Sequence, residues 1–81
     1  MNVRVQFYAQ LREIIGVEEL HLELPEDATV HEALEQVYAQ QPILRAHDKN
    51  ILIGAGLEFV DRNYKLNPGE DIAIMPPVQG G

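Results

Sequence analysis

TVHEALEQVYAQ, at residues 29–40, is the stretch that decides the fold, because it joins a helix start signal to a continuous apolar stripe. Thr29 can accept a hydrogen bond from the amide of Glu32, whose carboxylate can reach back to the amide of Thr29, which makes a capping box. Apolar residues then recur at helical spacing, at Val30, Ala33, Leu34, Val37 and Tyr38. Pro42 offers no amide and disfavours a helical residue before it. We therefore predict a helix that ends before Pro42 and packs across a sheet.

Short strands are predicted before this helix. Residues 2–8 alternate with the period of a half-buried strand. Val3, Val5 and Phe7 are expected on one face, and Arg4, Gln6 and Tyr8 on the other. Residues 9–15 predict a short helix that stops at Gly16. Residues 20–24 alternate again and predict a second strand, which ends at Pro25 and is compatible with hairpin-like pairing to the first.

The second half of the chain predicts a connection, two short strands, a turn and a final strand. The expected elements are a polar connection over 43–50 with a short turn at 44–46, strands at 51–53 and 57–60 separated by a flexible Gly54-Ala55-Gly56, a turn at Asn67-Pro68-Gly69, and a strand at 72–75. This order favours an α+β fold of the β-grasp (ubiquitin-like) type, a mixed sheet wrapped around one main helix with short extra helical turns. Ferredoxin-like and other α+β arrangements contain the same kinds of element.

Size and composition limit the function classes. The chain has 81 residues, 46% of them hydrophobic, which predicts one small globular domain. Its net charge of -7 repels a phosphate backbone and favours basic protein surfaces as partners, although such a charge also simply keeps a small protein dissolved. No apolar run approaches the roughly 20 residues of a membrane helix, so we expect no membrane association and a cytoplasmic location. The absence of cysteine excludes a thiolate metal site or a persulfide on this chain.

The last residues, Met75-Pro76-Pro77-Val78-Gln79-Gly80-Gly81, combine prolines with a terminal glycine pair. Prolines stop strand pairing and keep the backbone extended, so we predict a domain at 1–75 and a projecting tail at 76–81. Glycines carry no side chain, which lets the backbone enter a narrow channel and approach a reacting centre. A Gly-Gly ending alone is also typical of a frayed terminus, but the prolines and the strand that leads into them favour a projecting tail.

The carboxylate of Gly81 is the predicted working group. A carboxylate is anionic and has no good leaving group, so a nucleophile attacks its carbon only after activation. Adenylation by ATP on a partner enzyme supplies that leaving group. A sulfur nucleophile then converts the terminus to a thiocarboxylate, which is a softer nucleophile than the original carboxylate.

Other polar residues make weaker candidates. The three histidines, His21, His31 and His47, fall in different predicted elements without ligand spacing, so we predict surface histidines and no metal site. The acidic pairs at 18–19, 26–27 and 70–71 lie near turns and are expected to be solvated rather than catalytic.

An apolar surface beside the tail is a further candidate. If Ile72 and Ile74 face the core, strand alternation turns Ala73 and Met75 outward. Leu57 and Phe59 then either join them in a surface for a protein partner or belong to the core.

Three segments resemble the sulfur-carrier subunits of molybdopterin synthase. They are Phe7-Tyr8-Ala9-Gln10-Leu11-Arg12-Glu13 with Gly16, then Pro68-Gly69-Glu70-Asp71, and above all Pro76-Pro77-Val78-Gln79-Gly80-Gly81. The resemblance spans essentially the whole chain, and the terminal PPVxGG is its specific part. It implies a β-grasp subunit whose C-terminus is converted to an acyl adenylate by an adenylyltransferase of the ubiquitin-activating type, with ATP. A sulfur donor protein then supplies the sulfur of the thiocarboxylate.

The resemblance also implies a catalytic partner. The tail enters the active site of the large synthase subunit, in an expected heterotetramer, and its sulfur passes to cyclic pyranopterin monophosphate to form molybdopterin. Gly81 is then the site of adenylation and thiocarboxylation, and Gly80 gives clearance in the channel. We predict that the partner-binding residues are Met75, Pro76, Pro77, Val78 and Gln79, with Leu57 and Phe59 if these two lie on the surface. The chain itself binds no cofactor and is active only with the large subunit.

One region departs from the family pattern. Members commonly carry an asparagine and a glycine after the third strand, where this chain has Gly56-Leu57 preceded by Gly54. The departure affects the local turn and part of the partner-facing surface. Two alternatives to the molybdopterin role stay open: a carrier of thiamine or another sulfur pathway, and a noncatalytic ubiquitin-like modifier or binding module.

Overall fold

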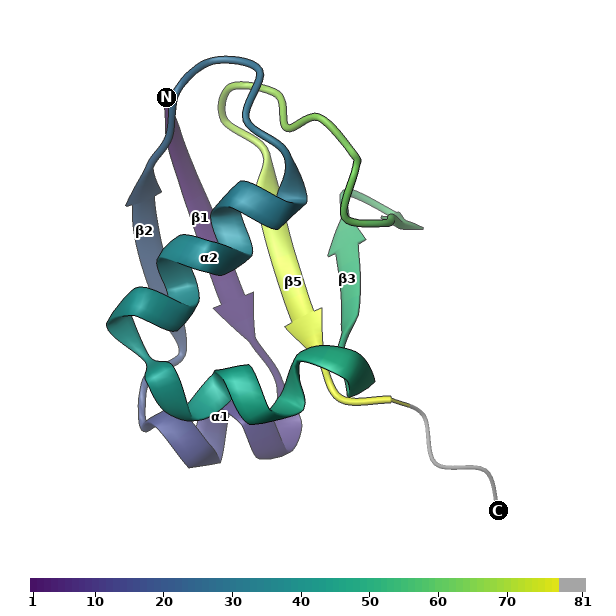
Figure 1. Cartoon of the computed structure of the whole chain (residues 1–81). Coiled ribbons are helices and arrows are strands. Elements are labelled where there is room, and N and C mark those ends of the chain that lie inside the picture. The colour runs from purple at the N-terminus through teal and green to yellow at the C-terminus, as the bar shows by residue number, and fades with distance from the viewer. Residues whose placement is uncertain (78–81) are drawn as a thin grey trace.

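A computed structural model describes residues 1–77 as a five-stranded mixed sheet with its main helix on one face (Figure 1). The elements are β1 (Asn2–Phe7), α1 (Ala9–Ile15), β2 (Glu19–Glu23), α2 (Val30–Gln40), the 3-10 helix η1 (Pro42–Asn50), β3 (Leu52–Ala55), β4 (Glu58–Phe59) and β5 (Asp71–Met75). The helix α2 lies across the sheet, while α1 and η1 lie near the end of the sheet at which β1 and β5 finish (Figure 1).

The sheet has the strand order β2-β1-β5-β3-β4. The first strand pairs antiparallel with β2 and parallel with β5, and β3 pairs antiparallel with both β5 and β4. The parallel register places Val5 opposite Ile72, and the antiparallel one places Ile53 opposite Ile74. This arrangement confirms the β-grasp fold and the predicted pairing of the first two strands.

The main helix forms as its sequence predicts. The hydroxyl of Thr29 accepts a hydrogen bond from the amide of Glu32 at 3.4 Å, and the carboxylate of Glu32 accepts one from the amide of Thr29 at 3.4 Å. The five apolar stripe residues, Val30, Ala33, Leu34, Val37 and Tyr38, are all buried. They pack into one core with the inward-facing residues of the sheet, among them Val3, Val5, Phe7, Leu22, Ile53, Ile72 and Ile74.

Two predicted glycine positions take left-handed backbone angles. Gly16 has a φ of 73° and ends α1, with its amide donating to the carbonyl of Arg12 at 2.9 Å. Gly69 has a φ of 78° in the predicted turn, where the amide of Glu70 donates to the carbonyl of Asn67 at 3.0 Å. Both turns are therefore closed by backbone hydrogen bonds at residues that tolerate these angles.

Two predictions are corrected. Gly54 and Ala55 are not a flexible link, because they form the second half of β3 and pair with Phe59 and Glu58. The stretch predicted as a polar connection is instead η1, which begins at the proline that ends the preceding helix. Leu44 explains why this segment forms a helix, since its side chain is buried in the core and anchors the otherwise polar segment.

Three side chains join η1 to the rest of the domain. The hydroxyl of Tyr38 and the guanidinium of Arg62 both donate to the carboxylate of Asp48, the latter at 2.6 Å. The hydrogen bond from Tyr38, and then that from Arg62, lower the pKa of the Asp48 carboxyl. Burial, followed by the bond to Asp48, raises the pKa of Tyr38. The guanidinium of Arg45 lies 5.0 Å from the centre of the Tyr38 ring and adds a cation–π contact.

Candidate functional site: the open sheet face and the base of the tail

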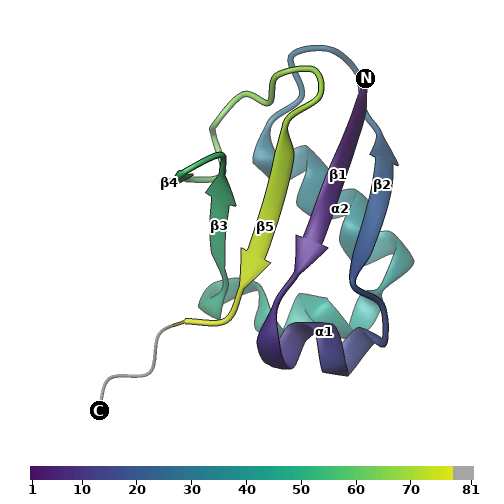
Figure 2. The same ribbon diagram turned by 180° about the vertical axis from the view of Figure 1, so that it is seen from behind.

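The face of the sheet that points away from the helices is in front in Figure 2. Along β5, Ile72 and Ile74 are buried in the core, while Ala73 and Met75 are partly exposed on the other side. The predicted alternation of this strand is therefore confirmed. It brings Met75, the last residue of β5, onto the open face directly before the two prolines of the tail.

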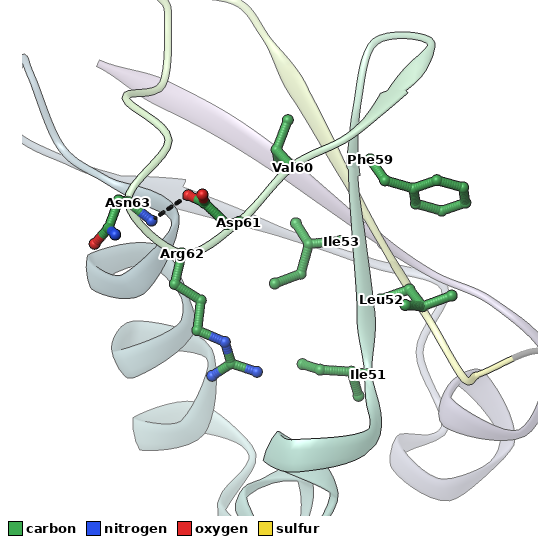
Figure 3. Close-up of a pocket in the computed structure, with 8 residues that line it drawn as sticks. All are labelled: Ile51, Leu52, Ile53, Phe59, Val60, Asp61, Arg62 and Asn63. Carbon is green, nitrogen blue, oxygen red and sulfur yellow. Dashed lines mark hydrogen bonds between the residues drawn. The ribbon is translucent and has the colours of Figure 1, made fainter.

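Leu57 and Phe59 lie on the surface rather than in the core. Leu57 is fully exposed and Phe59 is 69% exposed. Phe59 pairs with Gly54, which in turn pairs with Ala73, so its side chain shares the open face with Met75. Figure 3 shows Phe59 and Leu52 on one side of β3 and Arg62 on the other. Of the two readings left open by the sequence, the structure supports an apolar surface, the sheet-face patch of Leu57, Phe59 and Met75.

A shallow hollow of about 210 Å³ adjoins this patch. Its lining consists of Tyr8, Gly54, Gly56, Leu57, Glu58, Phe59, Ala73 and Met75. Tyr8 was not predicted as a site residue, although its place on the polar side of an alternating strand was a usable signal. An aromatic ring that is 43% exposed beside other exposed apolar groups is typical of a protein-binding surface.

The opposite half of the open face is polar, and its charges are paired within the chain. The guanidinium of Arg4 lies 2.5 Å from the carboxylate of Asp71, and its hydrogen bond to Asp71 raises the pKa of Arg4. The imidazole of His21 lies 2.8 Å from the carboxylate of Glu19. Because these charged groups already have partners within the chain, the apolar half of the face is the stronger candidate for binding another protein.

The base of the tail is fixed by the sheet. The amide of Tyr8 donates to the carbonyl of Ile74 at 3.2 Å, so the chain after β1 holds the end of β5. Pro76 and Pro77 follow and border a second hollow of about 350 Å³, whose remaining lining is Gln10, Leu11, Ile14, His47, Asn50 and Ile51. Val78, Gln79, Gly80 and Gly81 lie outside the described residues. Their assigned roles, and the boundary between domain and tail at residue 76, stay predictions.

The remaining polar candidates show structural contacts. Glu70 accepts a hydrogen bond from the hydroxyl of Tyr64 at 2.8 Å and one from the amide of Asn67 at 3.0 Å, so it braces its turn and is not simply solvated as predicted. Within residues 1–77, no group of three or more His, Cys, Asp and Glu side chains is placed to hold a metal ion. Over the same residues, no helix is long and apolar enough to cross a membrane.

A further hollow, of about 380 Å³, lies beside β3 and the segment that leaves β4 (Figure 3). Its one cationic side chain, Arg62, is bound to Asp48, and Asp61 accepts the amide of Asn63 at 2.8 Å. Because these polar groups already have partners, we assign this hollow no ligand.

Comparison with known proteins places the chain in a family. The family model described as the ThiS family matches residues 5–81. The chain belongs to the ThiS family. Among curated relatives, the molybdopterin synthase sulfur carrier subunit of Chlamydomonas reinhardtii is 34% identical, over 100% of both chains. The protein of the same name from Escherichia coli is 33% identical, over 98% of this chain and 99% of its own.

The fold of this chain is also similar to that of solved structures. SAMP1 from Haloferax volcanii superposes with a TM-score of 0.89 at 25% identity, over 100% of both chains. One chain of the complex of subunits 1 and 2 of the molybdopterin-converting factor from Helicobacter pylori superposes with a TM-score of 0.72 at 23% identity, again over 100% of both chains. The β-grasp arrangement is therefore shared with these proteins.

Proposed function

We propose that the chain is a sulfur carrier in molybdenum cofactor biosynthesis. The proposal is supported by the curated relatives in its family, which are named molybdopterin synthase sulfur carrier subunits and match over nearly the whole chain. The observation that carries it is the position of the sheet-face patch, whose Met75 directly precedes the prolines that lead to Gly81. A partner that docks on this patch is next to the base of the tail.

The proposed chemistry takes place at the carbonyl carbon of Gly81. Its carboxylate attacks the α-phosphate of ATP on an adenylyltransferase, which forms an acyl adenylate and releases pyrophosphate. A sulfur nucleophile from a donor protein attacks the carbonyl, and AMP leaves. With a persulfide as the donor, this attack gives an acyl disulfide. A thiol then attacks the donor's own sulfur, so that the thiocarboxylate leaves and the thiol and donor sulfurs end as a disulfide.

The thiocarboxylate then acts in a second enzyme. We propose that the tail enters the large subunit of molybdopterin synthase and that its sulfur attacks cyclic pyranopterin monophosphate. Water then cleaves the carbon–sulfur bond at the Gly81 carbonyl, which leaves the sulfur on the pterin and restores the Gly81 carboxylate. Gly80 lets the backbone pass a narrow channel, because it has no side chain. The domain provides the docking surface, and the large subunit provides the acid and base groups.

The sheet-face patch is the proposed docking surface for this large subunit. When a partner removes exposed leucine, phenylalanine and methionine side chains from water, the free energy of the complex is lowered by about 25 cal/mol per Å² of apolar surface. A complex between the two subunits of the Helicobacter pylori factor gives this assembly a precedent. The net charge of -7 favours a basic rim on the partner.

Intact-mass measurement tests the carrier function. The full chain is incubated with ATP, the adenylyltransferase of the same organism and a sulfur donor protein. We expect the replacement of one terminal oxygen by sulfur, which a chain lacking Gly81 does not show. Conjugation to a lysine of another protein, without any thiocarboxylate, would instead support the ubiquitin-like modifier.

The pathway is tested separately, because a carrier for thiamine or another sulfur pathway forms the same thiocarboxylate. The thiocarboxylated chain is mixed with the large synthase subunit and cyclic pyranopterin monophosphate. We expect molybdopterin to form; a stable thiocarboxylate with no product would favour another pathway.

A further inference from the structure

The backbone after β5 lacks the hydrogen bonds that orient a strand. Met75 is the last residue of β5 and pairs with Leu52 of β3. Pro76 and Pro77 follow, and because proline has no amide, neither can donate to a neighbouring strand. The sheet therefore fixes the chain only as far as Met75. Beyond it, the direction of the tail depends on the rigid proline rings and on the side chains beside them.

One wall beside these prolines comes from α1. A single residue, Tyr8, separates the end of β1 from α1, and Ala9, the first residue of α1, has a left-handed φ of 52°. This angle strains a residue other than glycine, so the surrounding structure holds α1 in this close position against local strain. The helix α1 consequently contacts β5. Its Ile14 lines the same hollow of about 350 Å³ as Pro76 and Pro77.

A second wall comes from η1 and is held by other contacts. Asp48 of η1 accepts hydrogen bonds from Tyr38 and Arg62, and Leu44 of η1 is buried in the core. His47, which lines the hollow, is the neighbour of Asp48 in this segment. The helix α1 also contacts η1 directly. The hollow at the base of the tail thus has two walls whose positions are set by contacts made without the tail.

Ile14 is the apolar side chain of this hollow that the core does not use. It is 38% exposed, whereas Leu11 is buried in the core and Ile51 packs against it. A proline ring is apolar, so contact between Ile14 and the prolines removes apolar surface of both from water. The side chain of Ile14 is therefore placed to hold the prolines rather than to stabilise the domain.

We infer that the hollow at the base of the tail is a guide that sets the direction of the tail, and that Ile14 is a positioning residue within it. This inference rests on the proposed function, in which Gly81 has to reach the reacting centres of two enzymes. The four residues after Pro77 reach at most about 14 Å when extended, so the direction of the prolines decides where Gly81 can arrive. A segment already held in its bound direction also loses less conformational entropy when it enters a channel.

A truncation cycle tests whether Ile14 acts through the tail. Ile14→Ala is made in the full chain and in a chain that ends at Pro77, which retains every helix and strand of the fold. Affinity for the purified large subunit is measured by calorimetry at fixed salt. We expect Ile14→Ala to weaken binding of the full chain about fivefold, as for the ordering of about one residue, and to change binding of the truncated chain less than about twofold.

Two further variants serve as controls. Ile14→Leu keeps the bulk of the side chain and should restore the affinity of the full chain. Ile43→Ala shortens another exposed isoleucine, on η1 and outside the hollow, and should bind like the wild type. Thermal unfolding of each variant shows whether a loss of binding reflects a loss of folding, which we do not expect for these exposed side chains.

A second measurement needs no partner. In the free full chain, nuclear Overhauser effects are expected between the methyl groups of Ile14 and the ring protons of Pro76 or Pro77. Their absence would overturn the guide, as would unchanged affinity of the full-length Ile14→Ala chain. Equal weakening of the full and truncated chains would show that Ile14 contacts the partner directly, and would overturn the guide but leave the carrier function intact. A wild-type chain that shows these effects but does not bind the large subunit would instead overturn the proposed partner.

Discussion

The hydroxyl of Tyr38 in α2 donates a hydrogen bond to the carboxylate of Asp48 in η1. The main helix is thereby fixed to η1, which supplies His47 and Asn50 to the hollow at the base of the tail. Arg62 completes the contact from the chain that follows β4. The core helix and the tail base are consequently parts of one connected structure.

Asp48→Asn should make the stability of the domain less sensitive to acid. A carboxyl group whose pKa is lowered in the folded state stabilises the fold above its unfolded pKa of about 4 and loses this contribution as the pH falls through the folded pKa. The wild type should therefore lose unfolding free energy below about pH 4 more steeply than Asp48→Asn. At pH 7 the variant should be less stable by about 1 kcal/mol, since the group is partly exposed.

Urea unfolding at several pH values measures this difference. Glu26→Gln, at an exposed turn, is the control for the loss of one carboxylate and should follow the wild type. Parallel curves for Asp48→Asn and wild type across the acid range would contradict the assigned role of Asp48.

Thr29→Ala should destabilise the domain by about 1 kcal/mol, because it removes the acceptor of the Glu32 amide at the first turn of α2. For a domain of this size the melting temperature should fall by roughly 4–8 °C. Thr29→Ser keeps the hydroxyl and should stay close to the wild type. An equal loss of stability in both variants would mean that Thr29 stabilises the domain through packing of its methyl group and not through capping.

Leu57→Ser and Phe59→Ser should each weaken binding to the large subunit about tenfold, the effect expected for a central apolar contact. Both side chains are exposed in the free chain, so unfolding free energies should change by less than about 0.5 kcal/mol. Ile43→Ser is the control, because it removes an exposed apolar side chain from η1, away from the sheet-face patch. Equal binding losses in all three variants would argue for general hydrophobicity rather than a defined surface.

Deletion of Gly81 should abolish molybdopterin formation and leave the melting temperature unchanged, since the described core ends with β5. Product formation with the large subunit and thermal unfolding are measured on the same preparation. Full product formation by the truncated chain would refute the assignment of Gly81 as the reacting residue.

Periodic and capped segments were predictable from the sequence, because their signals are local. The capping box of Thr29 and the alternation of β5 each depend on residues close in the chain. The hollow was not predictable, since Tyr8 and Gly54 meet Ala73 only through pairing of strands far apart in sequence. The helix η1 was not predicted, because the burial of one residue, Leu44, stabilises a segment that is otherwise polar.

The parallel pairing of β1 with β5 has a practical consequence for handling the protein. Met1 precedes one end of the central strand pair, and Pro76 follows the other. In the register that pairs Arg4 with Asp71, they are separated along the strands by about eight residues, or roughly 26 Å. An affinity tag or fluorophore attached before Met1 therefore lies at the opposite end of the sheet from the patch's Met75 and the tail. Assays of the carrier are best built on N-terminal labels, because any group added after Gly81 would consume the carboxylate itself.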